Sequence, residues 1–174
     1  MRTCDPTLDK PGLAALFAQQ GFTCGAEIGV RRGGFAGLLC QTIPGLRLRC
    51  VDPWRAYTTV PRLPSQRTQD ANYDRATAYL RPYGVTIDRR LSAAAVQDVP
   101  LGSLDFVYID AHHGFDYVWH DVTQWSARVR SGGIVSGDDY TPVAPGVVQA
   151  VDAYTTEQTI DFTTGPRVWY WRQA

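Results

Sequence analysis

The sequence predicts an α/β fold with a doubly wound, mainly parallel sheet. Short apolar runs alternate with stretches of helical periodicity, and the clearest strand pattern, residues 104–109, is followed by the clearest helical pattern, which begins at Phe115. The chain has 174 residues, of which 44% are hydrophobic and 20% are charged, as in ordinary globular domains. We therefore expect residues 1–174 to form a single domain, and the composition excludes disorder, collagen and coiled coil.

The first half of the chain predicts three strands and two helices. Residues 26–30 form a short apolar strand, and residues 33–42 follow as a helix with apolar side chains at helical spacing. A second strand is expected over 46–51, a helix over 67–80 and a short third strand over 85–88. These segments make two consecutive strand–helix units.

The second half continues the alternation. Residues 104–109 are rich in β-branched and aromatic side chains, which favour a strand, and residues 115–129 carry one apolar helical face. Two glycines end that helix and begin a strand over 134–136, and a further helix is expected around 147–154. Residues 168–171 contain three aromatics and predict a last strand at the sheet edge.

One long segment, residues 53–66, has no clear pattern and contains three prolines. Long loops in compact domains are usually functional or disordered. This loop follows the second strand and so lies at the carboxyl edge of the sheet, where open α/β sheets bind ligands. We expect a substrate-side loop here, with an ordinary mobile loop as the alternative.

The charge balance, the cysteines and the longest early apolar run indicate the kind of partner, the state of the thiols and the location of the protein. The 17 basic and 17 acidic residues give a net charge of zero, which favours neither nucleic acid nor a membrane as a partner. The four cysteines lack Cys-x-x-Cys spacing, and we expect reduced, mostly buried thiols. The apolar run over residues 13–18 is too short for a signal sequence or a membrane span, so a cytoplasmic protein is expected.

Aspartates follow three predicted strands. Asp52, Asp110, Asp138 and Asp139 should meet at one crevice because parallel strands share a carboxyl edge. Converging carboxylates repel one another unless a cation neutralises them, and a divalent cation such as Mg²⁺ prefers oxygen ligands of this kind. The alternatives are that such carboxylates cap helices, or that Asp139 caps the turn before Pro142 and leaves a metal-free site.

The first strand-to-helix turn carries the pattern Glu27-x-Gly29-x-x-x-Gly33. Dinucleotide-binding turns require glycine at the position held here by Arg31, so a pyrophosphate would meet a side chain. A ligand without phosphates still fits, and an acidic side chain of the protein would accept hydrogen bonds from its ribose hydroxyls. Asp52 lies 23 residues after Gly29, near the spacing expected for that acid.

Four motifs in order resemble those of class I S-adenosylmethionine methyltransferases, and more narrowly bacterial metal-dependent O-methyltransferases of the macrocin and antibiotic-sugar kind. The resemblance spans about residues 24–155. The motifs are Glu27-Ile28-Gly29-Val30-Arg31-Arg32-Gly33-Gly34-Phe35, Val51-Asp52-Pro53-Trp54, Phe106-Val107-Tyr108-Ile109-Asp110-Ala111-His112-His113-Gly114-Phe115-Asp116-Tyr117 and Gly132-Gly133-Ile134-Val135-Ser136-Gly137-Asp138-Asp139-Tyr140. The resemblance implies a Rossmann-like, mainly parallel sheet of seven strands with an antiparallel edge strand.

The resemblance also implies a role for individual residues. Those assigned to S-adenosylmethionine are Glu27, Gly29 and Gly33 at the methionine end, Asp52 on the ribose, Trp54 and Ser92 beside the adenine, and Asp110. Those assigned to Mg²⁺ are Asp110, Asp138 and Asp139. The catalytic set is Asp110, His112 and His113, with His112 as the favoured base because its ordinary pKa lies near neutrality. Capping of the helix that begins near Phe115 is the alternative for both histidines.

The expected activity is Mg²⁺-assisted O-methylation of a hydroxyl on a small polar molecule, a sugar or a catechol-like diol. The metal would lower the pKa of the hydroxyl. The alternatives are a metal-independent methyltransferase with another acceptor, nucleic acid included, and a non-catalytic S-adenosylmethionine-binding module. Nucleic acid is disfavoured because Asp139-Tyr140-Thr141-Pro142 has the wrong order to present a flipped base. Fewer than 25 residues precede the first predicted strand, so a lid would come from residues 53–66 or from a partner subunit of a homo-oligomer.

Overall fold

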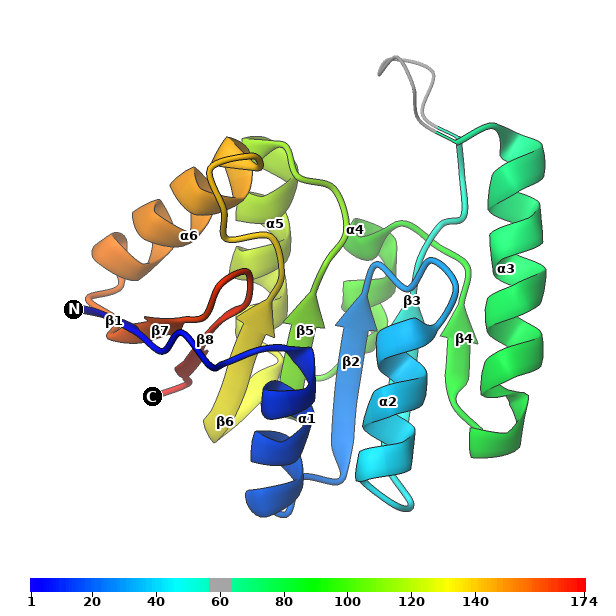
Figure 1. The fold of residues 1–174 in the computed structure, drawn as a ribbon, viewed down its shortest axis with the longest axis horizontal. Helices are drawn as coiled ribbons and strands as arrows, with labels where there is room; N and C mark the ends of the chain where they lie inside the picture. Colours follow the sequence, from blue (N-terminus) through cyan, green and yellow to red (C-terminus); the bar gives the residue numbers. More distant parts are fainter. Residues whose placement is uncertain (57–63) are drawn as a thin grey trace.

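A computed structural model provides the structure and describes residues 1–56 and 64–174. These residues form one sheet of eight strands in the order β1-β7-β8-β6-β5-β2-β3-β4, with helices on both faces (Figure 1). The predicted doubly wound, mainly parallel α/β class is confirmed. Five neighbouring strands, β6-β5-β2-β3-β4, are parallel, and β8 runs antiparallel to both β6 and β7.

The strands and helices alternate along most of the chain. The strands are β1 (Arg2–Cys4), β2 (Cys24–Ile28), β3 (Arg47–Val51), β4 (Thr86–Asp88), β5 (Leu104–Ile109), β6 (Val129–Gly137), β7 (Phe162–Thr164) and β8 (Trp169–Arg172). The helices are α1 (Lys10–Gln19), α2 (Gly34–Thr42), α3 (Gln66–Leu80), α4 (Ser92–Ala95), α5 (Phe115–Ser126) and α6 (Pro145–Glu157), with short 3₁₀ turns at Arg81–Tyr83 and Val96–Asp98.

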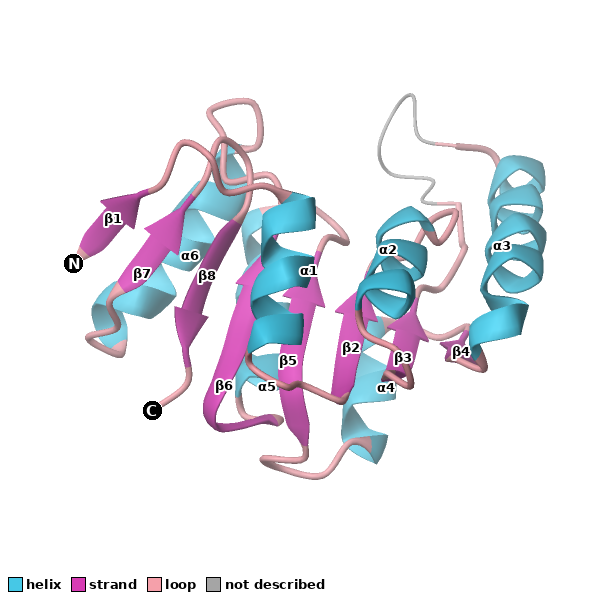
Figure 2. Cartoon of the chain, turned by 60° about the horizontal axis from the view of Figure 1, so that its bottom comes forward, coloured by secondary structure: helices cyan, strands magenta, loops and turns pink. Residues whose placement is uncertain are grey.

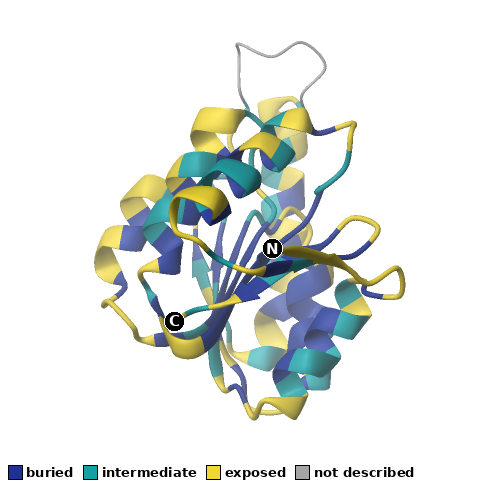
Figure 3. Cartoon of the chain, turned by 90° about the vertical axis from the view of Figure 1, so that its left-hand side faces the viewer, coloured by how far each residue is buried: buried dark blue, intermediate teal, exposed yellow. Residues whose placement is uncertain are grey.

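Two hydrophobic clusters fix the helices to the sheet. One joins α1, α2 and the end of α3 to one face, and includes Phe17 stacked on Phe106 with ring centroids 4.3 Å apart. The other joins α4, α5 and α6 to the opposite face through Trp125 and its neighbours. Figure 2 shows the two layers of helices, and Figure 3 shows the buried strands between their exposed outer surfaces. Each large side chain buried here contributes about 1.5–3 kcal/mol.

The observed elements differ from the predicted ones in several details, and α1, α4 and β7 were not predicted. The sheet has eight strands among the described residues, because β1 pairs outside β7, and β8 therefore lies inside the edge. Helix α5 ends at Ser126, and Val129 begins β6, since residues 127–128 turn the chain before the strand. Phe115, expected on the buried helical face, is 39% exposed because it belongs to the first turn of α5, at the rim of the sheet.

The predicted substrate-side loop, residues 53–66, falls largely outside the described residues, which omit 57–63. Its two described ends are tied together, since Gln66 Nε2 donates to the carbonyl of Trp54 at 3.0 Å and Gln66 Oε1 accepts from the amide of Ala56 at 3.0 Å. All four cysteines are free thiols. Cys40 and Cys50 are buried, Cys24 is half-buried and Cys4 is exposed.

In the part of the chain that the structure describes, none of the helices is both long and apolar enough to cross a membrane.

Candidate functional site

The carboxyl ends of β2, β5 and β6 lie side by side and gather the predicted acids. The amide of Asp110 donates to the carbonyl of Ile28 at 2.7 Å, and that of Asp138 donates to the carbonyl of Ile109 at 3.1 Å. These bonds place Asp110 between the ends of β2 and β6. Ligand atoms of Asp110, His113 and Asp139 all lie within 4.8 Å of one another. The predicted convergence of Asp110, Asp138 and Asp139 is therefore present.

Asp52, at the end of β3, holds the turn after β2. Its Oδ2 accepts the amides of Val30 at 3.0 Å and Arg31 at 2.9 Å, and its Oδ1 accepts the amide of Trp54 at 2.7 Å. Carboxylate oxygens can each accept about two hydrogen bonds, so Oδ1 keeps acceptor capacity. Asp52 thus fixes the glycine turn and still presents an acceptor at the sheet edge.

Gly29 lies at the closest backbone approach in the site. Its φ is +92°, and a Cβ there would lie 2.0 Å from the backbone oxygen of Asp110, so glycine is required on both counts. Gly33 has φ +80° and is the N-cap of α2. Gly34, the first residue of the helix, has open space where a Cβ would be. At Gly29 the backbone of the turn from β2 into α2 therefore packs directly against the end of β5.

Glu27 is a buried acid next to this turn. It is 2% exposed, and its Oε2 has no hydrogen-bond partner among the described residues. Burial, together with the negative charges of Asp110 and Asp52, raises the pKa of Glu27 well above its usual value. A buried oxygen without a donor is costly, and a cationic donor at the sheet edge would relieve it.

Two residues assigned to adenine are held by other groups. Trp54 is fully buried, has φ 41°, and donates through Nε1 to the carbonyl of Arg31 at 2.7 Å. The Ser92 hydroxyl accepts from Trp125 Nε1 at 2.7 Å and donates to the buried Asp121. Both side chains make hydrogen bonds within the protein, and a contact with adenine would require Trp54 to become exposed.

A lysine that sequence reasoning missed lies among the acids. Lys10 Nζ is 2.9 Å from Asp110 Oδ2 and 2.8 Å from Asp138 Oδ2. Burial opposes the charge of Lys10, but the two carboxylates outweigh it and raise its pKa. Burial raises the pKa of Asp138, but the hydrogen bonds from Lys10 and from the Asp139 amide, together with the charges of Lys10 and Arg167, outweigh it, so the net shift is downward. In Asp110 burial prevails and raises the pKa.

A second cation, also missed, flanks the other side. Arg167, in the turn between β7 and β8, bonds Asp139 through a terminal nitrogen, and its Nε lies 3.5 Å from Asp138 Oδ1. The latter is a charge contact rather than a hydrogen bond. Asp139 has φ 58°, a left-handed conformation that aspartate tolerates better than most residues. Its Oδ2 lies 3.0 Å from His113 Nε2, so Asp139 faces His113 on one side and Arg167 on the other.

The two histidines differ in their surroundings. His112 Nδ1 accepts the amide of Gly114 at 3.0 Å, and its ring lies 4.1 Å from that of Tyr117. Burial and the neighbouring His113 lower the pKa of His112. Gly114 is the N-cap of α5, and among the described residues no side chain caps that helix, so capping by His113 is not observed, whereas His112 accepts the amide of the cap residue itself.

One signal in the sequence could have pointed to Lys10: it is the single lysine among 17 basic residues. Arg167 gives no comparable signal, since it is one of 16 arginines and reaches the site only through the pairing of β8 with β6.

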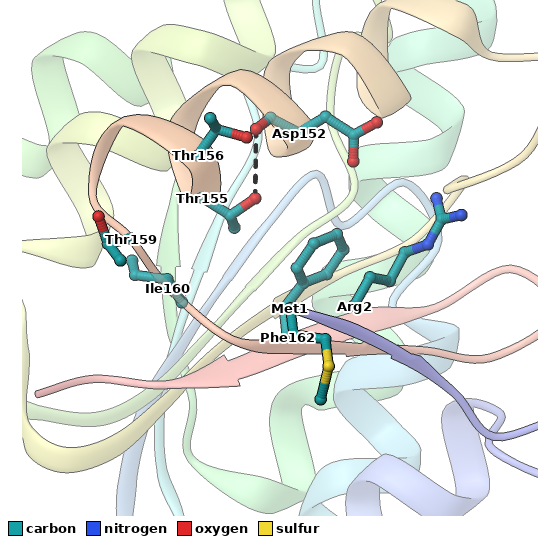
Figure 4. Close-up of a pocket in the computed structure, with 8 residues that line it drawn as sticks. All are labelled: Met1, Arg2, Asp152, Thr155, Thr156, Thr159, Ile160 and Phe162. Atoms are coloured by element: carbon teal, nitrogen blue, oxygen red, sulfur yellow. Dashed lines mark hydrogen bonds between the residues drawn. The ribbon is translucent and has the colours of Figure 1, made fainter.

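A pocket of about 580 Å³ lies elsewhere, between β1 and the end of α6 (Figure 4). Its lining residues are Met1, Arg2, Asp152, Thr155, Thr156, Thr159, Ile160 and Phe162, and none of them belongs to the predicted site. Chemistry, rather than volume, therefore locates the candidate site at the carboxyl edge.

A family model described as a methyltransferase domain matches residues 26–140, about two thirds of the chain and all of its acidic edge. The chain belongs to this methyltransferase family. Among curated proteins, none matches it. It is thus a methyltransferase-domain protein, and the matched segment runs from β2 to just after the end of β6.

Solved structures share the fold at low identity. An O-methyltransferase from Bacillus cereus in complex with SAH aligns with TM-score 0.69 and 16% identity over 94% of this chain and 80% of that one. The O-methyltransferase NovP gives TM-score 0.72 and 17% identity over 95% and 78%. TomG from Streptomyces achromogenes, involved in tomaymycin synthesis and solved with SAM, gives TM-score 0.69 and 15% identity over 98% and 83%.

Proposed function

We propose that this protein transfers a methyl group from S-adenosylmethionine to a hydroxyl on a small polar molecule, a sugar or a catechol-like diol. Membership of the methyltransferase family supports methyl transfer, and the O-methyltransferases of similar fold, two of them with SAH or SAM bound, support the donor and the acceptor atom. The observation that carries the proposal is the turn at Gly29, which packs on the backbone of Asp110, is held by Asp52 and adjoins the buried, unpartnered carboxyl of Glu27.

The residues present fit S-adenosylmethionine. The unpartnered Oε2 of buried Glu27 suits the cationic amino group of its methionine end, and the glycine at position 29 places no side chain in the way of a ligand without phosphates. Asp52 Oδ1 keeps acceptor capacity for a ribose hydroxyl. We therefore assign Glu27, Gly29, Gly33, Asp52 and Asp110 to the cofactor.

When bound, S-adenosylmethionine supplies an electrophilic methyl group, so the acceptor hydroxyl must lose its proton as its oxygen is methylated. His113 is the better base. Its Nε2 lies 3.0 Å from Asp139 Oδ2, and with the hydrogen of the neutral ring on Nε2 the lone pair at Nδ1 would take the proton. His112 already uses its Nδ1 lone pair on Gly114, so its neutral form carries hydrogen at Nε2 and is a donor.

Exposed apolar side chains beside the acids suit a ring-bearing acceptor. Tyr117 is 55% exposed next to His112, Phe115 stacks on Trp119, and Val143 projects from the loop after β6. The start of α6 presses on this loop region, since a Cβ at Gly146 would lie 2.4 Å from the carbonyl of His113. A small planar or cyclic molecule could pack on these rings with its hydroxyl toward His113.

The residues as they lie do not fit Mg²⁺ at Asp110, Asp138 and Asp139. Lys10 already bonds one oxygen each of Asp110 and Asp138, and Arg167 bonds Asp139. We assign no step of the reaction to a metal.

A net charge of zero supports a small molecule over nucleic acid as the acceptor, and the free thiols accord with the proposed cytoplasmic location.

The test measures transfer of a labelled methyl group from S-adenosylmethionine to a panel of sugars and catechols. With the accepted substrate, His113→Gln should lower the rate by about a hundredfold or more, since a general base contributes 10²–10⁴-fold. The affinity for S-adenosylhomocysteine should change little. His120→Gln is the matched control, because His120 is exposed on α5, the helix that follows His113. Unchanged transfer in His113→Gln would remove the assignment of the base, and no labelled product from any hydroxyl would contradict the proposed function.

A further inference from the structure

The ammonium of Lys10 lies at the centre of the acidic edge. It is within 2.9 Å of Asp110 Oδ2 and 2.8 Å of Asp138 Oδ2, so one cation bridges the ends of two neighbouring strands. The side chain of Asp138 is only 4% exposed and that of Lys10 is 35% exposed. Nζ also lies 5.4 Å from the centroid of the Tyr108 ring and 5.7 Å from that of Phe35, within reach of cation–π attraction.

Local structure gives no reason for a lysine here. Lys10 is the first residue of α1, where the helix dipole disfavours a positive charge, and Asp9 already caps the helix by accepting the amide of Gly12 at 2.8 Å. The sequence uses arginine at all its other basic positions. The favourable contacts of Lys10 are therefore tertiary, and they consist of the two carboxylates and the two rings.

Lys10 and a divalent metal compete for the same oxygens. A magnesium or manganese ion on the Oδ2 atoms of Asp110 and Asp138 would stand about 2.1 Å from each, and hence at most about 5 Å from Nζ. Arg167 adds a second positive charge on Asp138 and Asp139. Lys10 and Arg167 offset two of the three carboxylate charges, and the positive charge of Lys10 so close to the metal position repels a doubly charged ion.

We infer that Lys10 is the built-in cation of this site and replaces the divalent metal expected at Asp110 and Asp138. Lys10 acts as a positioning residue: its two hydrogen bonds hold both carboxylates at the edge of the sheet, beside the Gly29 turn. The binding claim stands on these contacts alone. Its catalytic corollary, methyl transfer that needs no metal, rests on the proposed function.

The experiment titrates Mn²⁺ into the full-length protein and follows binding by calorimetry and by the loss of the free Mn²⁺ EPR signal, with neither donor nor acceptor present. Lys10→Met keeps the length of the side chain and removes its charge. We expect this variant to bind one Mn²⁺ at least about a hundredfold more tightly than the wild type, because it leaves the carboxylates of Asp110 and Asp138 without their cation. Lys10→Arg should bind as weakly as the wild type.

Arg130→Met is the matched control, since it also removes a cation from an aspartate, Asp105, but at the opposite end of β5. It should gain no Mn²⁺ site. Tight binding of Mn²⁺ to the wild type would overturn the inference, and so would a folded Lys10→Met variant that binds no better than the wild type. If Lys10→Met does not fold, Lys10→Gln takes its place, and the wild-type titration still decides whether the native site accepts metal.

The catalytic corollary has its own readout. With the accepted substrate, wild-type transfer should keep its full rate in EDTA, and a loss restored by Mg²⁺ would contradict the corollary. Absence of any transfer, together with the Mn²⁺ site gained in Lys10→Met, would contradict the proposed function and leave the cation assignment intact.

Discussion

At the scale of single residues, the structure separates acids that face the site from acids that brace the scaffold. Asp110, Asp138 and Asp139 are compensated by cations at the sheet edge. Asp121 is 5% exposed, on the buried face of α5, and accepts a hydrogen bond from the Ser92 hydroxyl. Burial raises the pKa of Asp121 to about 6, because that hydroxyl offsets only part of the cost of burying its charge.

The first prediction concerns the pH dependence of stability. A carboxyl whose pKa is higher in the folded than in the unfolded state favours folding when protonated, so this contribution declines as pH rises from about 4 to about 6. Asp121→Asn removes the ionisation. The free energy of unfolding of this variant should exceed that of the wild type by about 1–3 kcal/mol at pH 8 and by less at pH 4. Urea denaturation at the two pH values measures both differences. A variant less stable than the wild type at pH 8 would contradict this.

The second prediction separates two roles for Ser92. Ser92→Ala removes the donor to Asp121 and the acceptor for Trp125, and should cost about 1–3 kcal/mol of stability. Its affinity for S-adenosylhomocysteine should stay within about twofold of the wild type, since the hydroxyl is already used inside the protein. A tenfold or greater loss of affinity in a variant of wild-type stability would instead support the adenine contact that the sequence suggests.

At the scale of elements, the glycine turn between β2 and α2 is the part of the site that local sequence specifies best. A positive φ and a close backbone neighbour coincide at Gly29, whereas Gly21 has a positive φ of 68° and nothing near its would-be Cβ. We predict that Gly29→Ala unfolds the protein or displaces the end of β5, with loss of ligand binding. Gly21→Ala should lower the free energy of unfolding by only about 1 kcal/mol, because the left-handed backbone conformation is then the only source of strain. Thermal melts of both variants test this, and equal effects would contradict it.

The elements with strong periodicity could be predicted, and those defined by distant partners could not. Strand β5 was predicted at its observed bounds, and the acids after β3, β5 and β6 follow from the parallel order of the strands. Strand β1 has only three residues, all exposed, and exists because it pairs with β7 some 160 positions away. Local periodicity carries no trace of such a pairing.

At the scale of the whole molecule, the site is assembled from both ends of the chain. Residues near the start bring Lys10 to the rim, the glycine turn and Asp110 come from the middle, and Arg167 comes from the turn before the last strand (Figure 1). The sequence could indicate the carboxylates but not their counter-charges, because Lys10 and Arg167 reach the rim only through the complete sheet.

This assembly predicts that a ligand at the rim stabilises the entire fold. S-adenosylhomocysteine at about 100 times its Kd should add about 2.7 kcal/mol to the free energy of unfolding, since it binds only the folded state. The melting temperature should rise with ligand concentration, as measured by calorimetric melts, and adenosine alone should raise it less. A melting temperature that does not respond to the ligand would mean that no such site exists at the rim.

The central claim is that the rim around Gly29 binds a nucleoside-bearing methyl donor, and calorimetric titration with S-adenosylhomocysteine tests it most directly. We predict one site per chain in the wild type and a loss of affinity of about tenfold or more in Asp52→Ala, because that change removes the ribose acceptor and frees the amides of the turn. Asp98→Ala, remote from the turn, should bind like the wild type. Equal binding by all three proteins, or no binding by the wild type, would contradict the claim.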